Sequence, residues 1–322
     1  MARSGVSAGS GGTRGSGGAI RGWLVLVVLA GIVSVLSLGG LNFGRILEPV
    51  RGVTFGRPPA ASVGVAAVHP DAALQSRVDQ AVVVSRGAIG AYVLTLGRGA
   101  QAVNNADRAF PAASLFKLPI LVEVLAQQRL KRLDPEQLLE IRPEDWTDGS
   151  GVLQARVGEQ LTVRELLRLM IQESDNIAAL VLLNAVGSDN VNATLERLGL
   201  AGTHVVDRRS GDAGENVTTA RDMAILLTTI ASGQLIDADA SESALKLLEL
   251  EQASTWLAEG LPWWVKVAHK WGDLPDARHD AGIVFTPRGT FVAVVLTEDA
   301  PPDEAEHAIA RTSLAAYDYL GD

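Results

Sequence analysis

The residues with the clearest potential for covalent chemistry are Ser114 and Lys117, which form an S-x-x-K pattern. On a helix this spacing places both side chains on one face. A serine hydroxyl becomes an effective nucleophile when a base removes its proton. Lys117 can be that base if burial and a neighbouring cation keep its amine neutral. Taken alone, the pattern is more simply explained by a capped surface helix.

The predicted position of Ser114 adds a second chemical element. Residues 111–130 have an apolar face and predict a helix with Ser114 in its first turn. The backbone N–H groups of a first turn have no partner within the helix. They can stabilise the negative oxygen that develops when a carbonyl is attacked, helped by the positive end of the helix dipole.

A second cluster, Ser174, Asp175 and Asn176, follows a predicted helix over residues 161–172. Ser174 could relay a proton to a leaving group, and Asn176 could hold a substrate amide. The same residue types also suit a turn and an N-cap before a helix that begins at Ile177. Both interpretations remain open at this stage.

A third cluster, Lys270, Trp271 and Gly272, lies at the end of a predicted apolar strand. A cation beside a glycine suits an anionic substrate that must approach the backbone closely. The alternative is an edge-strand lysine that discourages aggregation.

The order S-x-x-K, S-D-N and K-x-G, in the contexts PAASLFKLP, LMIQESDNIAAL and VAHKWG, resembles the class A β-lactamases and related penicillin-recognising serine hydrolases. The resemblance covers roughly residues 73–320. It implies an α+β fold of the β-lactamase type, in which an all-helical lobe packs against a five-stranded antiparallel sheet flanked by helices.

The resemblance also implies catalytic roles. Ser114 is the nucleophile that becomes acylated, and Lys117 is its base or proton relay. Ser174 passes the proton to the leaving nitrogen. The backbone N–H groups of Ser114 and Asp273 form the oxyanion hole. Which group first abstracts the proton is left open.

The implied substrate-binding residues show one departure from the family pattern. Asn176 orients the amide of the acyl side chain, and Lys270 binds the substrate carboxylate. Gly272 belongs to the same motif. Trp271 stands where the family has a serine or threonine whose hydroxyl helps to bind that carboxylate. We expect Arg278 or His279 to compensate.

A second departure concerns deacylation. Most class A enzymes carry a glutamate, in a loop after the S-D-N motif, that activates the hydrolytic water. Here the loop reads HVVDRRSGDAGENVTT, is shortened, and has Ser210 at the glutamate position. The nearby acids are Asp207, Asp212 and Glu215, and we expect Glu215 to support the start of the next helix. Acylation is therefore expected, with slow deacylation.

The order of the remaining elements is consistent with the implied fold. Strands are predicted near both ends of the body, at residues 89–96, 264–269, 283–286 and 290–297. Further helices are predicted at residues 71–85, 177–186, 190–198, 218–231, 241–258 and 304–320. A sheet assembled from both ends with an inserted helical lobe satisfies this order.

The first seventy residues differ in composition from the rest. Residues 1–22 are rich in glycine and serine and predict a disordered basic leader. Residues 23–41 carry no charge and are long enough to cross a bilayer as a helix. Residues 42–70 form a linker to the hydrolase domain over residues 71–322. The preceding arginines predict a cytoplasmic leader and a single-pass anchor, with the catalytic domain outside the cytoplasmic membrane. Secretion after signal cleavage is the alternative.

Composition narrows the function further. The formal net charge is −9, and the part after residue 71 holds 22 basic against 35 acidic residues, so nucleic acid is not an expected partner. There is no cysteine, and the five histidines show no metal-binding spacing, so we expect neither a metal nor a cofactor. We expect a monomer that takes a β-lactam or a peptidoglycan-like substrate.

Three functions follow from these observations. The leading one is a membrane-anchored serine hydrolase that opens β-lactams, and so confers antibiotic resistance, through an acyl-serine intermediate. The second is a D-Ala-D-Ala carboxypeptidase of the cell wall, which does not need the missing glutamate. The third is a non-catalytic binding domain, which the presence of Ser114, Lys117, Ser174 and Lys270 argues against.

Overall fold

The computed structural model describes residues 70–207, 214–249 and 256–321. The predicted leader, the predicted anchor over residues 23–41 and nearly all of the linker lie outside this part of the chain. Among the helices that the structure describes, none has the length and apolarity needed to cross a membrane.

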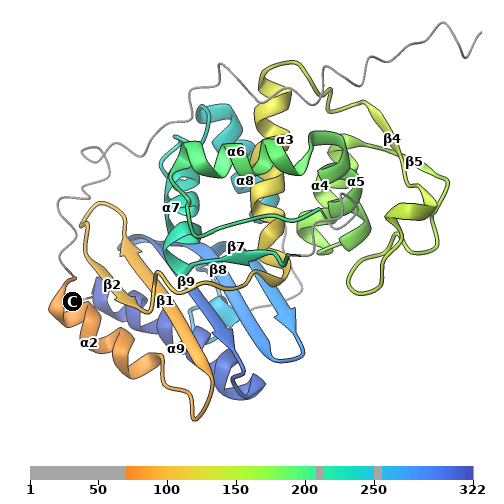
Figure 1. Ribbon diagram of the computed structural model, residues 1–322. Coiled ribbons are helices and arrows are strands. Elements are labelled where there is room, and N and C mark those ends of the chain that lie inside the picture. The colour runs from red at the N-terminus through yellow and green to blue at the C-terminus, as the bar shows by residue number, and fades with distance from the viewer. Residues whose placement is uncertain (1–69, 208–213, 250–255, 322) are drawn as a thin grey trace, which may run out of the picture. The chain divides into compact units, whose positions relative to one another are not determined.

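A five-stranded antiparallel sheet forms one half of the described body (Figure 1). Its order is β2-β1-β9-β8-β7. The strands are β1 (Ala88–Thr95), β2 (Gln101–Asn104), β7 (Lys266–Leu274), β8 (Ala277–Thr286) and β9 (Gly289–Glu298). Segments from both ends of the body therefore build one sheet, as the sequence order predicted.

Both faces of the sheet are covered, which explains why the central strands β1 and β9 are mostly apolar and buried. Helices α2 (Ala72–Ala81) and α9 (Pro302–Gly321) pack against each other and form one core with residues of β1 and β9. Helix α7 (Ala220–Ala231) contacts β1, β8 and β9 and belongs to the second, larger core. The sheet thus separates two hydrophobic layers.

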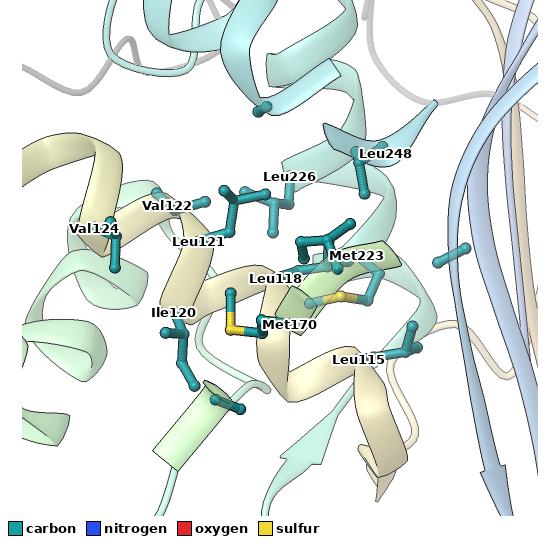
Figure 2. Packing of buried hydrophobic residues seen from close by; sticks show 14 of the residues in the cluster. Leu115, Leu118, Ile120, Leu121, Val122, Val124, Met170, Met223, Leu226 and Leu248 are labelled. Atoms are coloured by element: carbon teal, nitrogen blue, oxygen red, sulfur yellow. The ribbon is translucent and has the colours of Figure 1, made fainter. Parts of the chain in front are cut away.

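The larger core lies in the helical lobe, around α3 (Lys117–Arg129). Every residue of α3 from Lys117 to Gln127 is buried. Figure 2 shows its leucines and valines packed among Met170, Met223 and Leu248. The surrounding helices are α4 (Val163–Gln172), α5 (Asn176–Val186), α6 (Ser188–Leu198), α7 and α8 (Ala238–Leu248). A helix enclosed in this way gives a rigid base for the residues at its start.

Several short elements complete the described body. Strands β3 (Phe110–Pro111) and β6 (Val217–Thr218) pair with each other, as do β4 (Leu138–Glu140) and β5 (Gln160–Thr162). The 3-10 helices are η2 (Ala113–Phe116), η3 (Pro143–Asp145) and η5 (Trp256–Ala258).

The structure corrects several predicted boundaries and adds one strand to the sheet. The helix predicted from Pro111 begins only at Lys117, because Phe110 and Pro111 pair with β6 and a 3-10 turn follows. The helix predicted to reach residue 258 ends at Leu248, and residues 250–255 lie outside the described part. Strand β7 continues four residues beyond Lys270, so the K-x-G motif is inside the strand. Strand β2 was missed, because it is short and its apolar residues do not alternate clearly.

Candidate active site

Ser114 lies in η2, between strand β3 and helix α3. The preceding residue, Ala113, has a φ of +44°, in the left-handed region that residues with a Cβ seldom adopt. Such strain persists where the surroundings fix it and is concentrated at functional sites. Here the backbone N–H of Ala112 donates to the Asn216 carbonyl at 2.8 Å. This bond holds the turn that carries Ser114 against the segment before β6.

Lys117 is fully buried and is the centre of the polar cluster around Ser114. Its Nζ atom lies 3.0 Å from Ser114 Oγ and 3.0 Å from Ser174 Oγ. It also lies 2.5 Å from the Ser174 carbonyl oxygen and 2.8 Å from Asn176 Oδ1. The sequence prediction that these four residues form one site is consistent with this geometry.

The contacts of Lys117 suit a proton acceptor. Four oxygens surround a nitrogen that has at most three protons to donate. The Ser174 carbonyl and Asn176 Oδ1 can only accept, so they take two N–H bonds. A neutral amine has two such protons and one lone pair. In a neutral amine, that lone pair would face the hydroxyl of Ser114 or Ser174.

Ser174 contacts both Ser114 and Lys117. Its hydroxyl lies 3.0 Å from Ser114 Oγ, and its side chain is fully buried. Its φ of +49° reverses the chain between the end of α4 and the start of α5. This unfavourable conformation turns the hydroxyl and the carbonyl of Ser174 together toward Lys117.

Asp175 is the N-cap of α5, as the structural interpretation of the S-D-N motif predicted. One carboxylate oxygen accepts from the Ala178 N–H at 2.8 Å and caps α5. The other accepts from the N–H groups of Val152 and Leu153 at 2.6 and 3.0 Å. The motif therefore combines both interpretations, because Asp175 holds the fold while Ser174 and Asn176 contact Lys117. Its link to the 148–153 loop was not predicted.

Asn176 is held at the edge of the same loop. Its side-chain amide donates to the Asp148 carbonyl at 3.1 Å, which leaves Oδ1 toward Lys117. Its backbone N–H donates to the Ser150 carbonyl at 3.0 Å. The loop thus forms one wall of the site.

Gly272 brings strand β7 against the turn that carries Ser114. A Cβ at position 272 would lie 2.9 Å from Ala113 Cβ and 3.2 Å from Ser114 N. Only glycine allows the strand to approach this closely. Lys270 lies two positions before Gly272 on β7, so both residues are on the same face of the strand. The Lys270 side chain is fully buried. The K-x-G motif therefore belongs to the same site.

Trp271 and Arg278 make contacts within the protein. The Lys270 Nζ atom lies 4.9 Å from the centroid of the Trp271 ring, a cation–π distance, and Trp271 packs edge-on against Trp256. The Arg278 guanidinium donates to Asp273 Oδ1 and to the Leu274 carbonyl, each at 2.5 Å. The contacts with substrate that the sequence predicted for Trp271 and Arg278 stay predictions.

A cleft of about 410 Å³ opens beside Ser114. It is lined by Pro111, Ala113, Ser114, Phe116, Gly149, Ser150, Asn176, Glu215, Asn216, Asp273 and Leu274. Glu215 does not support the next helix as predicted, because α7 begins at Ala220 and is capped by Thr219. The cleft lies between α5, β7 and the segment before β6. Ser210 and Asp212 lie outside the described residues.

His279 supports, from the sheet, the turn that carries Ser114. Its Nδ1 atom accepts from the Thr297 N–H at 3.1 Å, so its Nε2–H donates to the Pro111 carbonyl at 2.7 Å. Burial lowers the pKa of this imidazole, which favours the neutral form that both bonds require. His279 thus positions the turn from within the sheet. Among the described residues, no group of three or more His, Asp or Glu is arranged to hold a metal ion.

The arrangement fits a serine acyl transfer, and comparison with known proteins agrees. A model of the β-lactamase enzyme family matches residues 73–320. The chain belongs to this β-lactamase enzyme family. It is 29% identical over 243 residues to β-lactamase L2 of Stenotrophomonas maltophilia, which covers 71% of this chain and 80% of the relative.

Solved structures show the same relationship. The crystal structure of a β-lactamase from Sphaerobacter thermophilus has a TM-score of 0.71 at 28% identity, over 77% of this chain and 97% of that one. The structure of PBP-A has a TM-score of 0.73 at 27% identity, over 79% and 97%. The predicted β-lactamase-type α+β fold and the serine hydrolase assignment are both confirmed. The chain is a serine hydrolase of this family.

Proposed function

We propose that the chain opens the ring of β-lactams through a covalent acyl-serine on Ser114. The observation that carries this proposal is the Lys117 amine, buried within 3.0 Å of both Ser114 Oγ and Ser174 Oγ. A hydroxyl, a base and a relay hydroxyl in mutual contact are what this reaction requires. The β-lactamase relatives support the choice of substrate.

In the proposed acylation, Ser114 Oγ attacks the lactam carbonyl while its proton passes to Lys117. The carbonyl oxygen becomes an oxyanion that accepts from the backbone N–H groups of Ser114 and Asp273. When the C–N bond breaks, the proton returns through Ser174 to the leaving nitrogen. The products are the opened ring and an ester on Ser114, so no co-reactant is needed. Lys270 attracts the substrate carboxylate.

Deacylation is the slower step in this proposal. Water must attack the ester and regenerate Ser114, and it needs a base to do so quickly. Ser210, at the position of the family's glutamate, cannot act as a carboxylate base. We therefore expect an acyl-enzyme that persists longer than the acylation step.

A chromogenic cephalosporin followed with and without a D-Ala-D-Ala peptide tests the proposal. The proposed function predicts that the cephalosporin changes colour in a reaction that requires Ser114. The colour should develop in an initial burst, followed by a slow steady rate. Faster turnover of the peptide than of the cephalosporin would favour a carboxypeptidase instead. Folded protein that forms no adduct with either compound would favour the non-catalytic domain.

The carboxypeptidase remains a second candidate because of one specific likeness. A point mutant of PBP-A, solved as an acyl-enzyme complex with penicillin-G, has a TM-score of 0.73 to this chain at 28% identity. That protein thus holds penicillin as a covalent adduct. A chain with the same fold and no evident deacylating glutamate could equally have a peptide as its natural substrate.

We further propose that the enzyme is anchored in the cytoplasmic membrane through residues 23–41, with the catalytic domain outside it. The support is the uncharged stretch and the arginines before it. Carbonate extraction of membranes followed by protease treatment of intact spheroplasts tests this location. A chain released by carbonate, or protected from protease, would contradict it.

A further inference from the structure

The end of the sheet at which β7 begins carries an exposed pair of aromatic rings. Trp263 is 92% exposed and Trp264 53% exposed, and their ring centroids lie 6.2 Å apart. We propose that this end, here called the tryptophan end, docks onto the headgroup layer of the bilayer that holds the chain. The proposal rests on the membrane anchoring proposed above.

The local structure projects these two rings outward. The Val265 N–H donates to the Pro262 carbonyl at 2.9 Å and closes a turn with both tryptophans at its tip. On either side, Leu261 and Val265 pack against the core beneath α9. Burying them fixes the turn and leaves the indole rings to solvent. Exposed indoles are costly in water and are favoured at the membrane interface, where the ring is apolar and the N–H remains hydrated.

The chain also reaches the body at this end. Pro70 forms a bridge with Gln101, at the start of β2, and the Asp71 N–H donates to the Gln101 carbonyl at 2.9 Å. In the antiparallel sheet, the start of β2 lies at the same end as the start of β7 and the β8–β9 turn. The linker before Pro70 therefore joins the body on the side of the tryptophans. The 28 residues between Leu41 and Pro70 can reach at most about 100 Å, so a chain anchored through residues 23–41 cannot leave the vicinity of the bilayer.

The charges of the described residues favour the same orientation. At the tryptophan end the exposed cations Arg98, Lys266 and Arg288 are matched by Asp71, Glu259 and Asp318. The opposite end carries Asp273, Asp276, Glu298, Asp299, Asp303, Glu304 and Glu306 against Arg86, Arg108 and Arg278. An anionic bilayer would repel the opposite end and tolerate the tryptophan end.

Docking in this orientation leaves the active site accessible. Strand β7 runs from Lys266 at the tryptophan end to Asp273 and Leu274, which line the cleft. The cleft mouth therefore lies toward the part of the sheet farther from the lipid. A substrate arriving from outside the membrane would meet an open site.

Two exposed prolines provide a matched pair of reporter positions. Pro287 lies in the β8–β9 turn at the tryptophan end, and Pro275 in the β7–β8 turn at the opposite end. The chain has no cysteine, so Pro287→Cys and Pro275→Cys each give one site for an environment-sensitive fluorophore. The full-length variants are reconstituted in vesicles of phosphatidylethanolamine and phosphatidylglycerol. A separate flotation assay measures whether each protein stays attached to the vesicles.

Docking predicts that the fluorophore at position 287 is shielded from an aqueous quencher at least tenfold more than that at 275. Adding Trp263→Ser and Trp264→Ser should lower the equilibrium constant for docking by at least about tenfold. The difference in quenching between positions 287 and 275 should then disappear. Circular dichroism checks that the variant stays folded. Equal quenching in chains that float, or shielding that survives both serines, would overturn docking while leaving the anchor intact. Chains that do not float would overturn the anchor and docking with it.

Discussion

The Nζ atom of Lys117 lies 3.0 Å from Ser114 Oγ, and no part of the lysine side chain reaches solvent. The same nitrogen contacts the hydroxyl and the carbonyl of Ser174. A lysine enclosed in this way cannot be a surface contact that happens to be near a serine. It ties the start of α3 to the turn before α5, and so connects Ser114, the proposed nucleophile, to Ser174, the proposed proton relay.

Replacing Lys117 by methionine tests whether the amine acts as the base. Methionine keeps much of the volume and removes the proton acceptor, so acylation should slow by about 10²- to 10⁴-fold. Burst kinetics with a chromogenic cephalosporin measure the acylation rate. Lys246→Met is the matched control, because Lys246 is exposed and pairs only with Glu242 among its salt bridges in the described structure. Unchanged acylation in Lys117→Met would remove the lysine from the mechanism.

A methyl group at position 272 should disturb the site from the strand side. Gly272→Ala places a Cβ 2.9 Å from Ala113 Cβ, so either β7 or the turn that carries Ser114 must move. The donors of the oxyanion hole then separate, and acylation should fall by roughly 10²-fold. Gly199→Ala serves as control, because its Cβ meets no atom within 4 Å and its left-handed φ affects stability alone. Equal acylation by the two variants would contradict the close approach of β7.

Asp175→Ala and Asp237→Ala separate capping from support of the cleft. Both aspartates cap a helix, at α5 and α8, and losing a cap costs about 1 kcal/mol of unfolding free energy. Asp237 also pairs with the exposed Arg129, a surface contact that adds at most about 1 kcal/mol. Asp175 also accepts from Val152 and Leu153, so its loss should cost about 3 kcal/mol or more. Urea unfolding measures both values. If the two variants lost the same stability, the contacts to the 148–153 loop would have no energetic role.

The extent to which sequence predicts the site differs from residue to residue. Ser114, Lys117, Ser174 and Asn176 could be proposed together from the sequence because the joint order of their motifs resembles one family, and the structure places the four side chains in contact. The sequence also predicted the helical lobe, since α4 and α7 have clear apolar faces. These features depend on local spacing, which a sequence records directly.

Features that depend on tertiary contacts could not be found in this way. The role of His279 requires knowing that β8 reaches the Pro111 carbonyl, 168 positions away. The start of α3 was misplaced because Phe110 and Pro111 pair with β6, a partner that no local pattern shows. The prediction placed Glu215 at the start of a helix because of its charge. In the structure, the antiparallel pairing of β3 with β6 brings the segment of Glu215 beside the turn that carries Ser114.

The buried Glu123 should make stability depend on pH. Burial raises its pKa to about 7, despite hydrogen bonds from Thr194 and Gln127. Between the ordinary value of about 4.3 and 7, the folded protein keeps a proton that the unfolded chain has released. Its contribution is therefore present below about pH 4.3 and is lost as pH rises through 7, by up to about 3 kcal/mol.

Glu123→Gln isolates this effect. The difference in unfolding free energy between the variant and the wild type should grow in favour of glutamine from pH 5 to pH 8. His279 acts in the opposite direction, because its lowered pKa costs stability as pH falls below about 6.5. That contribution is common to both proteins and cancels in the difference. A difference that stays constant with pH would show that Glu123 does not titrate in this range.

The most direct test of the central claim is intact-mass spectrometry of the protein mixed with penicillin-G, with Ser114→Ala as control. The account predicts that the wild type gains the mass of one whole penicillin, since ring opening expels nothing, and that peptide mapping locates the adduct on Ser114. The alanine variant should stay unmodified. An equal adduct on Ser114→Ala, or a folded wild type that is never acylated and never consumes the antibiotic, would contradict Ser114 as the nucleophile.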